Sequence, residues 1–139
     1  YEIASCLVGS EMCIRDRTQI YNPDVIVIMD DSLCVLPETY AGLKAGGVVV
    51  VNTVHPLEKL NVPEQAGIVI ACDATGISEA LFGTNLPNTA VLGAMSHILK
   101  FIDRELLFSE IEKTFNSLNR KAAETAFDSI RVLKGEVSE

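Results

Sequence analysis

Tryptophan is absent from this 139-residue chain, and histidine is scarce, with His55 and His97 as the only two. Four cysteines are present, but no two of them form a Cys-x-x-Cys pair. Neither histidine has a Cys, Asp or His at the spacing of a metal site. A four-iron cluster needs four thiolates, and only Cys34 and Cys72 lie outside residues 1–17, which are interpreted below as not native. Because a His–carboxylate constellation is lacking too, we expect no catalytic residue and no metal ligand in this chain.

Long apolar runs and an excess of positive charge are also lacking. No segment is apolar enough, over sufficient length, to cross a bilayer. The net charge of −8 argues against a nucleic-acid partner, which needs clustered Lys and Arg. Cys34 and Cys72 stand alone on apolar segments, where single thiols are usually buried. With 48% hydrophobic residues, we expect a packed core rather than a disordered chain. Since the cysteines do not indicate an oxidising compartment, we expect a cytoplasmic protein with no nucleic-acid or membrane partner.

Residues 1–17 read as foreign to the rest of the chain. Residues 7–17 match the translation of a transposase sequencing adapter. A signal peptide is the competing interpretation, but Glu11, Arg15 and Asp16 interrupt the apolar run that it would need. We therefore interpret residues 1–17 as not native, and residues 18–139 as most of one domain.

Three β-branched runs predict buried strands at residues 25–30, 48–53 and 68–72. A short helix is predicted over residues 37–45, opened by Pro37 and ended by two glycines, and another over residues 74–82, ended by Gly83. Strands that alternate with helices indicate an α/β fold with a largely parallel sheet. We expect a three-layer α/β/α sandwich.

Three more helices are predicted in the second half of the chain. They cover residues 88–101, a segment capped by Asp103, and a last helix from residue 118 to about residue 135. Their predicted buried stripes are Leu92, Met95, Leu99 and Ile102; Leu107, Ile111 and Phe115; and Ala123, Phe127 and Ile130.

Polar side chains follow each of the three predicted strands. In open α/β sheets, ligands bind beyond the carboxyl ends of the strands. The alternative is that these side chains only turn the chain and cap the next helix. Both interpretations stay open on the residues alone. The six candidates for a shared ligand crevice are Asp30, Ser32, Asn52, Thr53, Asp73 and Thr75.

Residues 86–94, Leu-Pro-Asn-Thr-Ala-Val-Leu-Gly-Ala, form the most informative segment. Asn88 is predicted to cap a helix by accepting a hydrogen bond from an N–H group of its first turn. Gly93 and Ala94 would let this helix lie close to another backbone. Asn88 and Thr89 join the candidate binding residues.

Four segments in sequence carry a family resemblance: residues 19–30, 43–53, 73–75 and 86–94. Together they resemble the gamma subunit of pyruvate and other 2-oxoacid:ferredoxin (flavodoxin) oxidoreductases, over nearly all of residues 18–137. The resemblance implies that residues 18–139 are part of the gamma-type catalytic domain. It also implies that a strand, a glycine-rich loop and a helix at the front of that domain are missing.

Members of that family convert a 2-oxoacid and coenzyme A to an acyl-CoA such as acetyl-CoA, CO2 and reduced ferredoxin, a reaction of anaerobic metabolism. The resemblance implies that this chain holds no cofactor alone and helps to bind coenzyme A in a crevice between subunits. Thiamine diphosphate and four-iron four-sulfur clusters would lie on partner subunits of the alpha, beta and delta types. Ferredoxin or flavodoxin would bind through the complex.

Two alternatives remain. One is the related small subunit of indolepyruvate oxidoreductase, which differs in substrate rather than fold. The other is a stand-alone nucleotide-binding module of Rossmann-like fold. Pyruvate is the substrate favoured by the Pro-Asn-Thr form of residues 87–89.

Overall fold

The computed structural model describes residues 3–6 and 20–136 of the chain. These residues form two compact units, which are described in turn. Among the described residues, the first comprises residues 3–6 and 20–51, His55–Ile70 and Val132–Glu136, and the second comprises Asn52–Val54 and Ala71–Arg131.

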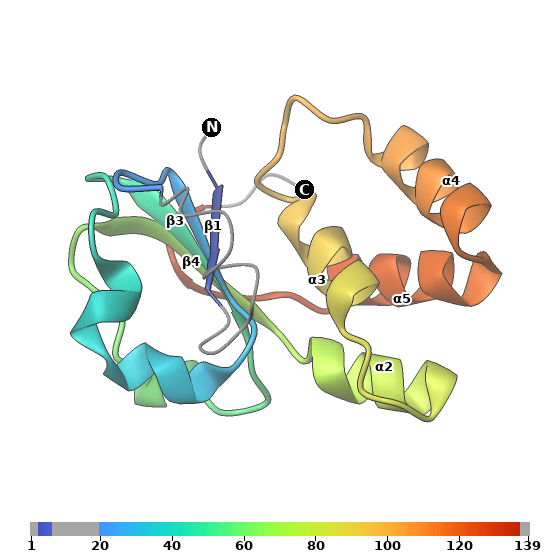
Figure 1. Ribbon diagram of the computed structural model, residues 1–139, viewed down its shortest axis with the longest axis horizontal. Helices are drawn as coiled ribbons and strands as arrows, with labels where there is room; N and C mark the ends of the chain where they lie inside the picture. Colours follow the sequence, from blue (N-terminus) through green and yellow to red (C-terminus); the bar gives the residue numbers. More distant parts are fainter. Residues whose placement is uncertain (1–2, 7–19, 137–139) are drawn as a thin grey trace. The chain divides into compact units, whose positions relative to one another are not determined.

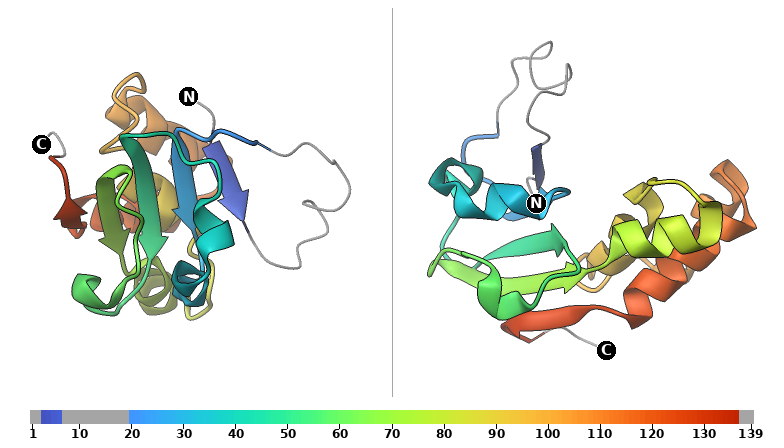
Figure 2. Two further views of the ribbon diagram at one scale, coloured as in Figure 1. Left: turned by 90° about the vertical axis from the view of Figure 1, so that its left-hand side faces the viewer. Right: turned by 90° about the horizontal axis from the view of Figure 1, so that it is seen from below.

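A five-stranded sheet in the order β1-β2-β3-β4-β5 organises the first unit. Its strands are β1 (Ile3–Cys6), β2 (Val25–Ile28), β3 (Gly47–Asn52), β4 (Ala66–Cys72) and β5 (Arg131–Lys134). β1 pairs with β2 and β2 pairs with β3, both in parallel, as the left view of Figure 2 shows. β1 lies within residues 1–17, the segment interpreted above as foreign.

Every residue of β2 and β3 is buried, as expected of strands covered on both faces. The three predicted strands are confirmed, each to within two residues at either end. The α/β class with a largely parallel sheet is confirmed as well. β5 was not predicted: residues 131–134 alternate between half-buried and exposed, and the sequence analysis assigned them to the last helix.

Short 3-10 helices connect the strands of the first unit: η1 (Asp31–Val35), η2 (Pro37–Tyr40) and η3 (Leu57–Lys59). The helix predicted over residues 37–45 was therefore too long. Gly42 has a φ of +77°, outside the helical region, and a Cβ there would collide with the Tyr21 carbonyl oxygen. Pro37 opens η2 as predicted, but the chain leaves helical geometry at the C-cap, Ala41.

Four helices form most of the second unit (Figure 1): α2 (Ala74–Phe82), α3 (Asn88–Met95), α4 (Arg104–Thr114) and α5 (Ser117–Asp128). α2 has the predicted bounds and ends in a left-handed Gly83 with φ +69°. Asp103 caps α4 as predicted, by accepting a hydrogen bond from the Leu106 N–H at 2.8 Å. α3 and α5 end earlier than predicted, at Met95 and Asp128.

The helices α3 and α5 lie unusually close together. A Cβ on Gly93 would collide with the backbone of Ala123 on α5, which confirms the predicted close approach. Nearby, Phe108, Ile111 and Ala123 form a buried cluster, against which Phe127 packs. The predicted α4 stripe was wrong at one position, because Phe115 is 61% exposed. It is the C-cap of α4, where the helical period no longer sets which way a side chain points.

Among residues 3–6 and 20–136, the structure contains no helix with the length and apolar character that a membrane crossing requires.

Candidate functional site

Asn52 and Thr75 form a two-point hydrogen-bonded pair in the second unit. The Asn52 Nδ2 donates to Thr75 Oγ1 at 2.8 Å, and the Asn52 Oδ1 accepts from the Thr75 backbone N–H at 3.2 Å. Asn52 ends β3 and Thr75 lies in the first turn of α2, so the structure brings together these two candidate residues. Asn52 is only 8% exposed, and its carboxamide therefore acts as a buried tether to α2.

Asp73 is the N-cap of α2. Its Oδ1 accepts from the Gly76 N–H at 2.8 Å, and a Cβ on residue 76 would collide with this carboxylate. Two backbone N–H groups of the first turn, those of Thr75 and Gly76, are thus satisfied by protein oxygens. An external anion would have to displace the side-chain oxygens of Asn52 and Asp73 from these N–H groups, and the negative charge of Asp73 would repel it.

Thr53 contributes two backbone hydrogen bonds to this cluster. Its N–H donates to the Cys72 carbonyl at 2.9 Å, and its carbonyl accepts from the Arg131 guanidinium. Burial raises the pKa of the Cys72 thiol from 9.0 to about 11, so Cys72 stays protonated at neutral pH. Arg131 was missed by the sequence analysis because it lies in the segment that was predicted as helix.

Asn88 is not the cap of α3, contrary to prediction. The N-cap is Pro87, which has no side-chain capping bond, and Asn88 is the first helical residue. Pro87 already adopts αR geometry, with φ −76° and ψ −3°, and the helix therefore starts one position earlier than the Asx pattern implies. The Asn88 side chain is exposed beside a first turn that no side chain caps.

Thr89 points into the protein. It is 6% exposed, and its hydroxyl donates to Asn119 Oδ1 on α5 at 3.0 Å. Sequence spacing gives no signal for this partner, which lies 30 positions along the chain. Thr89 therefore helps to join α3 to α5.

Asp30 and Ser32 lie together in the first unit. Asp30 is the N-cap of η1, and its Oδ1 accepts from the Ser32 N–H at 3.0 Å. Hydrogen bonds from the Ser32 side chain and backbone hold the pKa of Asp30 below its usual value. The neighbouring side chains of His55 and Asp31 approach to 3.8 Å, from Nε2 to Oδ2, and this contact was missed because 24 positions separate the two residues.

These contacts favour helix capping over ligand binding at most candidate positions. Asp30, Asn52, Asp73, Thr75 and Thr89 bond to protein groups through their side chains. A phosphate of coenzyme A does not fit the start of α2, where a carboxylate occupies the anion position. The uncapped first turn of α3 fits better, since its N–H groups and Asn88 can meet an anion. Within the described part of the chain, no group of three or more His, Cys, Asp and Glu could hold a metal ion.

The parallel pairing of β1, β2 and β3, together with the helices, defines the class of the protein: an α/β domain. The family model for pyruvate ferredoxin/flavodoxin oxidoreductase matches residues 3–129. The chain therefore belongs to the pyruvate ferredoxin/flavodoxin oxidoreductase family.

Curated relatives and a solved structure agree with this assignment. The chain is 40% identical over 121 residues to the pyruvate/ketoisovalerate oxidoreductases common subunit gamma of Thermococcus kodakarensis, covering 83% of this chain and 65% of that subunit. It is 34% identical over 135 residues to the gamma subunit of NADH-dependent phenylglyoxylate dehydrogenase from Aromatoleum evansii, covering 94% of this chain and 71% of that subunit. The crystal structure of pyruvate oxidoreductase subunit PORC from Thermotoga maritima matches with a TM-score of 0.71 and 28% identity, over 83% of this chain and 67% of that one.

Proposed function

We propose that this chain is the gamma-type subunit of a 2-oxoacid:ferredoxin oxidoreductase. The family match over residues 3–129 carries the proposal. The complex oxidatively decarboxylates a 2-oxoacid, transfers the acyl group to coenzyme A, and passes two electrons to ferredoxin or flavodoxin. Pyruvate is the substrate to test first, because pyruvate appears in the names of both the Thermococcus relative and the Thermotoga structure.

The partners of this chain are subunits of the alpha, beta and delta types, which carry the thiamine diphosphate and the iron–sulfur clusters. The gamma chain is structural and contributes to the coenzyme A site. We place the assembly in the cytoplasm, in keeping with the free thiols of Cys34 and Cys72.

Of the eight candidate residues, Asn88 is the one that we propose to contact coenzyme A. Coenzyme A supplies the thiol that accepts the acyl group. The first turn of α3 presents backbone N–H groups without a capping side chain, and Asn88 adds an exposed carboxamide beside them. Such a turn suits a phosphate oxygen.

The Asn88→Ala variant of the complete complex tests this contact. We expect the KM for coenzyme A to rise about tenfold, which corresponds to one lost charge-assisted hydrogen bond. Electron transfer from pyruvate to the clusters should be unchanged. Asn85→Ala is the matched control, because Asn85 is an exposed residue of the preceding loop. An unchanged KM in a well-folded Asn88→Ala complex would remove Asn88 from the site.

We further propose that the foreign segment is confined to residues 7–17. The family match begins at residue 3, and β1 pairs in register with β2, with Ile3 opposite Val25. A long sequencing read through the native gene tests this. It should encode Ile3–Cys6 and Thr18 with different residues between them, and a read identical to residues 7–17 would contradict the proposal.

A further inference from the structure

The helices α3 and α5 pack against each other in the second unit and run in the same direction (Figure 1). Three contacts along their length each join residues that are 30 positions apart in the chain. The three pairs are Thr89 with Asn119, Gly93 with Ala123, and His97 with Phe127. The N-terminal ends of the two helices therefore lie together, and so do their C-terminal ends.

The middle and the C-terminal end of α3 are fixed on α5 by close packing. Gly93 leaves no room for a Cβ against the backbone of Ala123. Beyond α3, the His97 ring stacks on the Phe127 ring with 3.8 Å between centroids, and its Nε2 lies 2.7 Å from the Phe127 carbonyl oxygen. The hydrogen bond from the Thr89 hydroxyl to α5 then fixes the first turn of α3.

Asn119 holds that first turn in a defined position because its own carboxamide is held at both ends. Its Oδ1 accepts from the Thr89 hydroxyl at 3.0 Å. Its Nδ2 donates to Asn116 Oδ1 at 3.0 Å, and the same oxygen accepts the Asn119 backbone N–H at 3.0 Å as the cap of α5. The cap of α5 thus sets the direction in which Asn119 presents its oxygen to Thr89, the residue next to Asn88.

Electrostatics makes the shared N-terminal end the one that needs such a hydrogen bond. The first turns of α3 and α5, which the structure describes in full, contain no acidic residue, and their N-caps are Pro87 and Asn116. By contrast, Asp73 caps α2 and Asp103 caps α4. The positive ends of two helices placed side by side repel each other, and a bound anion lowers that repulsion. The hydrogen bond between the two helices opposes the repulsion before an anion arrives.

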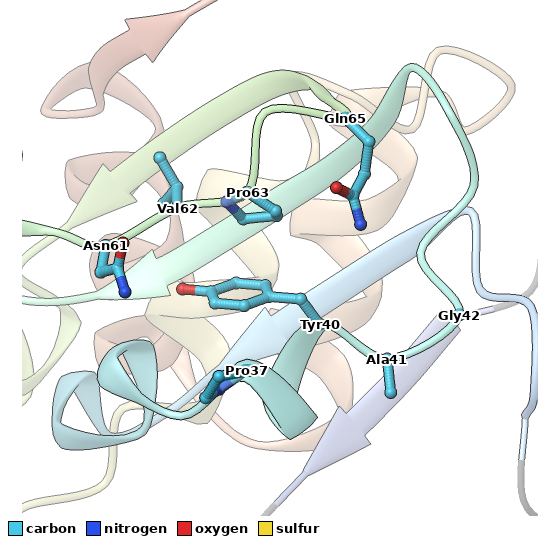
Figure 3. A pocket seen from close by; sticks show the side chains of 8 residues that line it. All are labelled: Pro37, Tyr40, Ala41, Gly42, Asn61, Val62, Pro63 and Gln65. Atoms are coloured by element: carbon cyan, nitrogen blue, oxygen red, sulfur yellow. The ribbon is translucent and has the colours of Figure 1, made fainter.

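The pocket of the first unit does not compete with this end for a phosphate. Its eight lining residues come from the segments 37–42 and 61–65, and none of them carries a charge. The ring of Tyr40 lies between Pro37 and Pro63 and takes up the space between them (Figure 3). A phosphate therefore finds no counter-charge in that pocket.

We propose that Asn119 is a positioning residue for coenzyme A, acting through Thr89 on the first turn of α3 and on Asn88. The inference rests on the proposed contact between Asn88 and coenzyme A. Asn119 does not touch the ligand, because its carboxamide is engaged by Thr89 and Asn116. Without its oxygen the first turn of α3 is free to shift, and a shifted turn binds a phosphate less well.

Steady-state kinetics of the complete complex tests this role. Asn119→Ala and Thr89→Val should each raise the KM for coenzyme A about fivefold, less than the loss of Asn88 itself, and leave kcat and the KM for pyruvate unchanged. The Thr89→Val/Asn119→Ala double variant should be no worse than either single variant, because both remove the same hydrogen bond. Thr89→Ser keeps the hydroxyl and should restore the wild-type KM.

Thr125→Val is the matched control on α5. The Thr125 hydroxyl donates to the Lys121 carbonyl within the same helix, so its loss should leave the KM for coenzyme A unchanged. A purely structural role of Asn119 would lower the yield of folded complex and the apparent kcat without a change in this KM, and that result would overturn the inference. A KM raised equally in Thr89→Ser and Thr89→Val would also overturn it.

Asn88→Ala, assayed beside these variants, separates the two possible failures. If Asn88→Ala raises the KM for coenzyme A and Asn119→Ala does not, the inference is wrong and the proposed contact stands. If Asn88→Ala leaves the KM unchanged in a folded complex, the proposed contact is wrong and the inference is wrong with it.

Discussion

Burial of Cys72 in the second unit makes the stability of the protein depend on pH. Burial raises its pKa from 9.0 to about 11, so the native state keeps a proton that the unfolded state loses above about pH 9. The native state thus binds more protons in this interval, and the free energy of unfolding must fall as the pH rises from about 9 through 11. The expected fall from this group is about 2–3 kcal/mol.

Denaturant unfolding at several pH values between 8 and 11 measures this effect. Cys72→Ala is the control, since it has no thiol to titrate. Its stability should decline less steeply over the same interval, whatever the cost of the substitution at pH 8. If the free energy of unfolding fell equally with pH in both proteins, the pKa of Cys72 would be the same in the folded and unfolded states, contrary to the account.

Gly93 is a residue at which side-chain size decides helix packing. A helical Gly→Ala change usually adds about 1 kcal/mol of stability. Here the new Cβ would meet the backbone of Ala123, and we expect Gly93→Ala to destabilise by about 2 kcal/mol or more. Gly83→Ala is the comparison, because nothing lies within 4 Å of its Cβ and only the φ of +69° opposes it.

The midpoints of thermal unfolding of the Gly93→Ala and Gly83→Ala variants measure these two effects. Gly93→Ala should lower the midpoint further than Gly83→Ala, for which a cost of about 1 kcal/mol is expected. If Gly93→Ala proved neutral or stabilising, α3 and α5 would not be in the close contact described.

At the scale of elements, the sequence predicted those strands and helices whose ends are determined by residues close to them in the chain. The β-branched runs of β2 and β3 and the Asp73–Gly83 boundaries of α2 are visible in sequence, because burial and capping act within a few residues. β5 was missed because Arg131–Lys134 is short, half-exposed and without β-branched periodicity. The early end of α3 likewise has no breaker in the sequence, since turns follow Met95 without Gly or Pro.

The hydrogen-bonded pair of Asn52 and Thr75, both in the second unit, is testable as a unit. Asn52→Ala should destabilise the protein by about 1–3 kcal/mol, because it leaves the Thr75 N–H and hydroxyl without their partner. With Thr75→Val as the second change, a double-mutant cycle should give a coupling of at least about 1 kcal/mol. Thr75→Ser is the control that retains the hydroxyl.

The same variants separate tethering from ligand binding. A folded Thr75→Ser complex should keep the wild-type KM for coenzyme A. Additive effects of Asn52→Ala and Thr75→Val would contradict the tether, and a raised KM in Thr75→Ser would restore these residues to the ligand site.

At the scale of the whole molecule, the sequence predicted the class and the family better than the site. Family motifs extend over most of the chain, so the match to the pyruvate ferredoxin/flavodoxin oxidoreductase family follows from many residues at once. The contacts of the candidate residues are single hydrogen bonds over long sequence separations, such as Thr89 to Asn119 or Arg131 to Thr53. No spacing rule encodes those partners, and the same Asp, Asn and Thr residues serve capping and binding equally well.

The central claim is that this chain completes a multi-subunit 2-oxoacid oxidoreductase. Its most direct test is to purify the complex from cells that express all of its subunits, with and without the full-length gene for this chain. Pyruvate- and coenzyme A-dependent reduction of ferredoxin is then measured. The account predicts that the chain co-purifies with the subunits that hold thiamine diphosphate and the clusters, and that activity is lost in its absence. A fully active complex assembled without it would contradict the account.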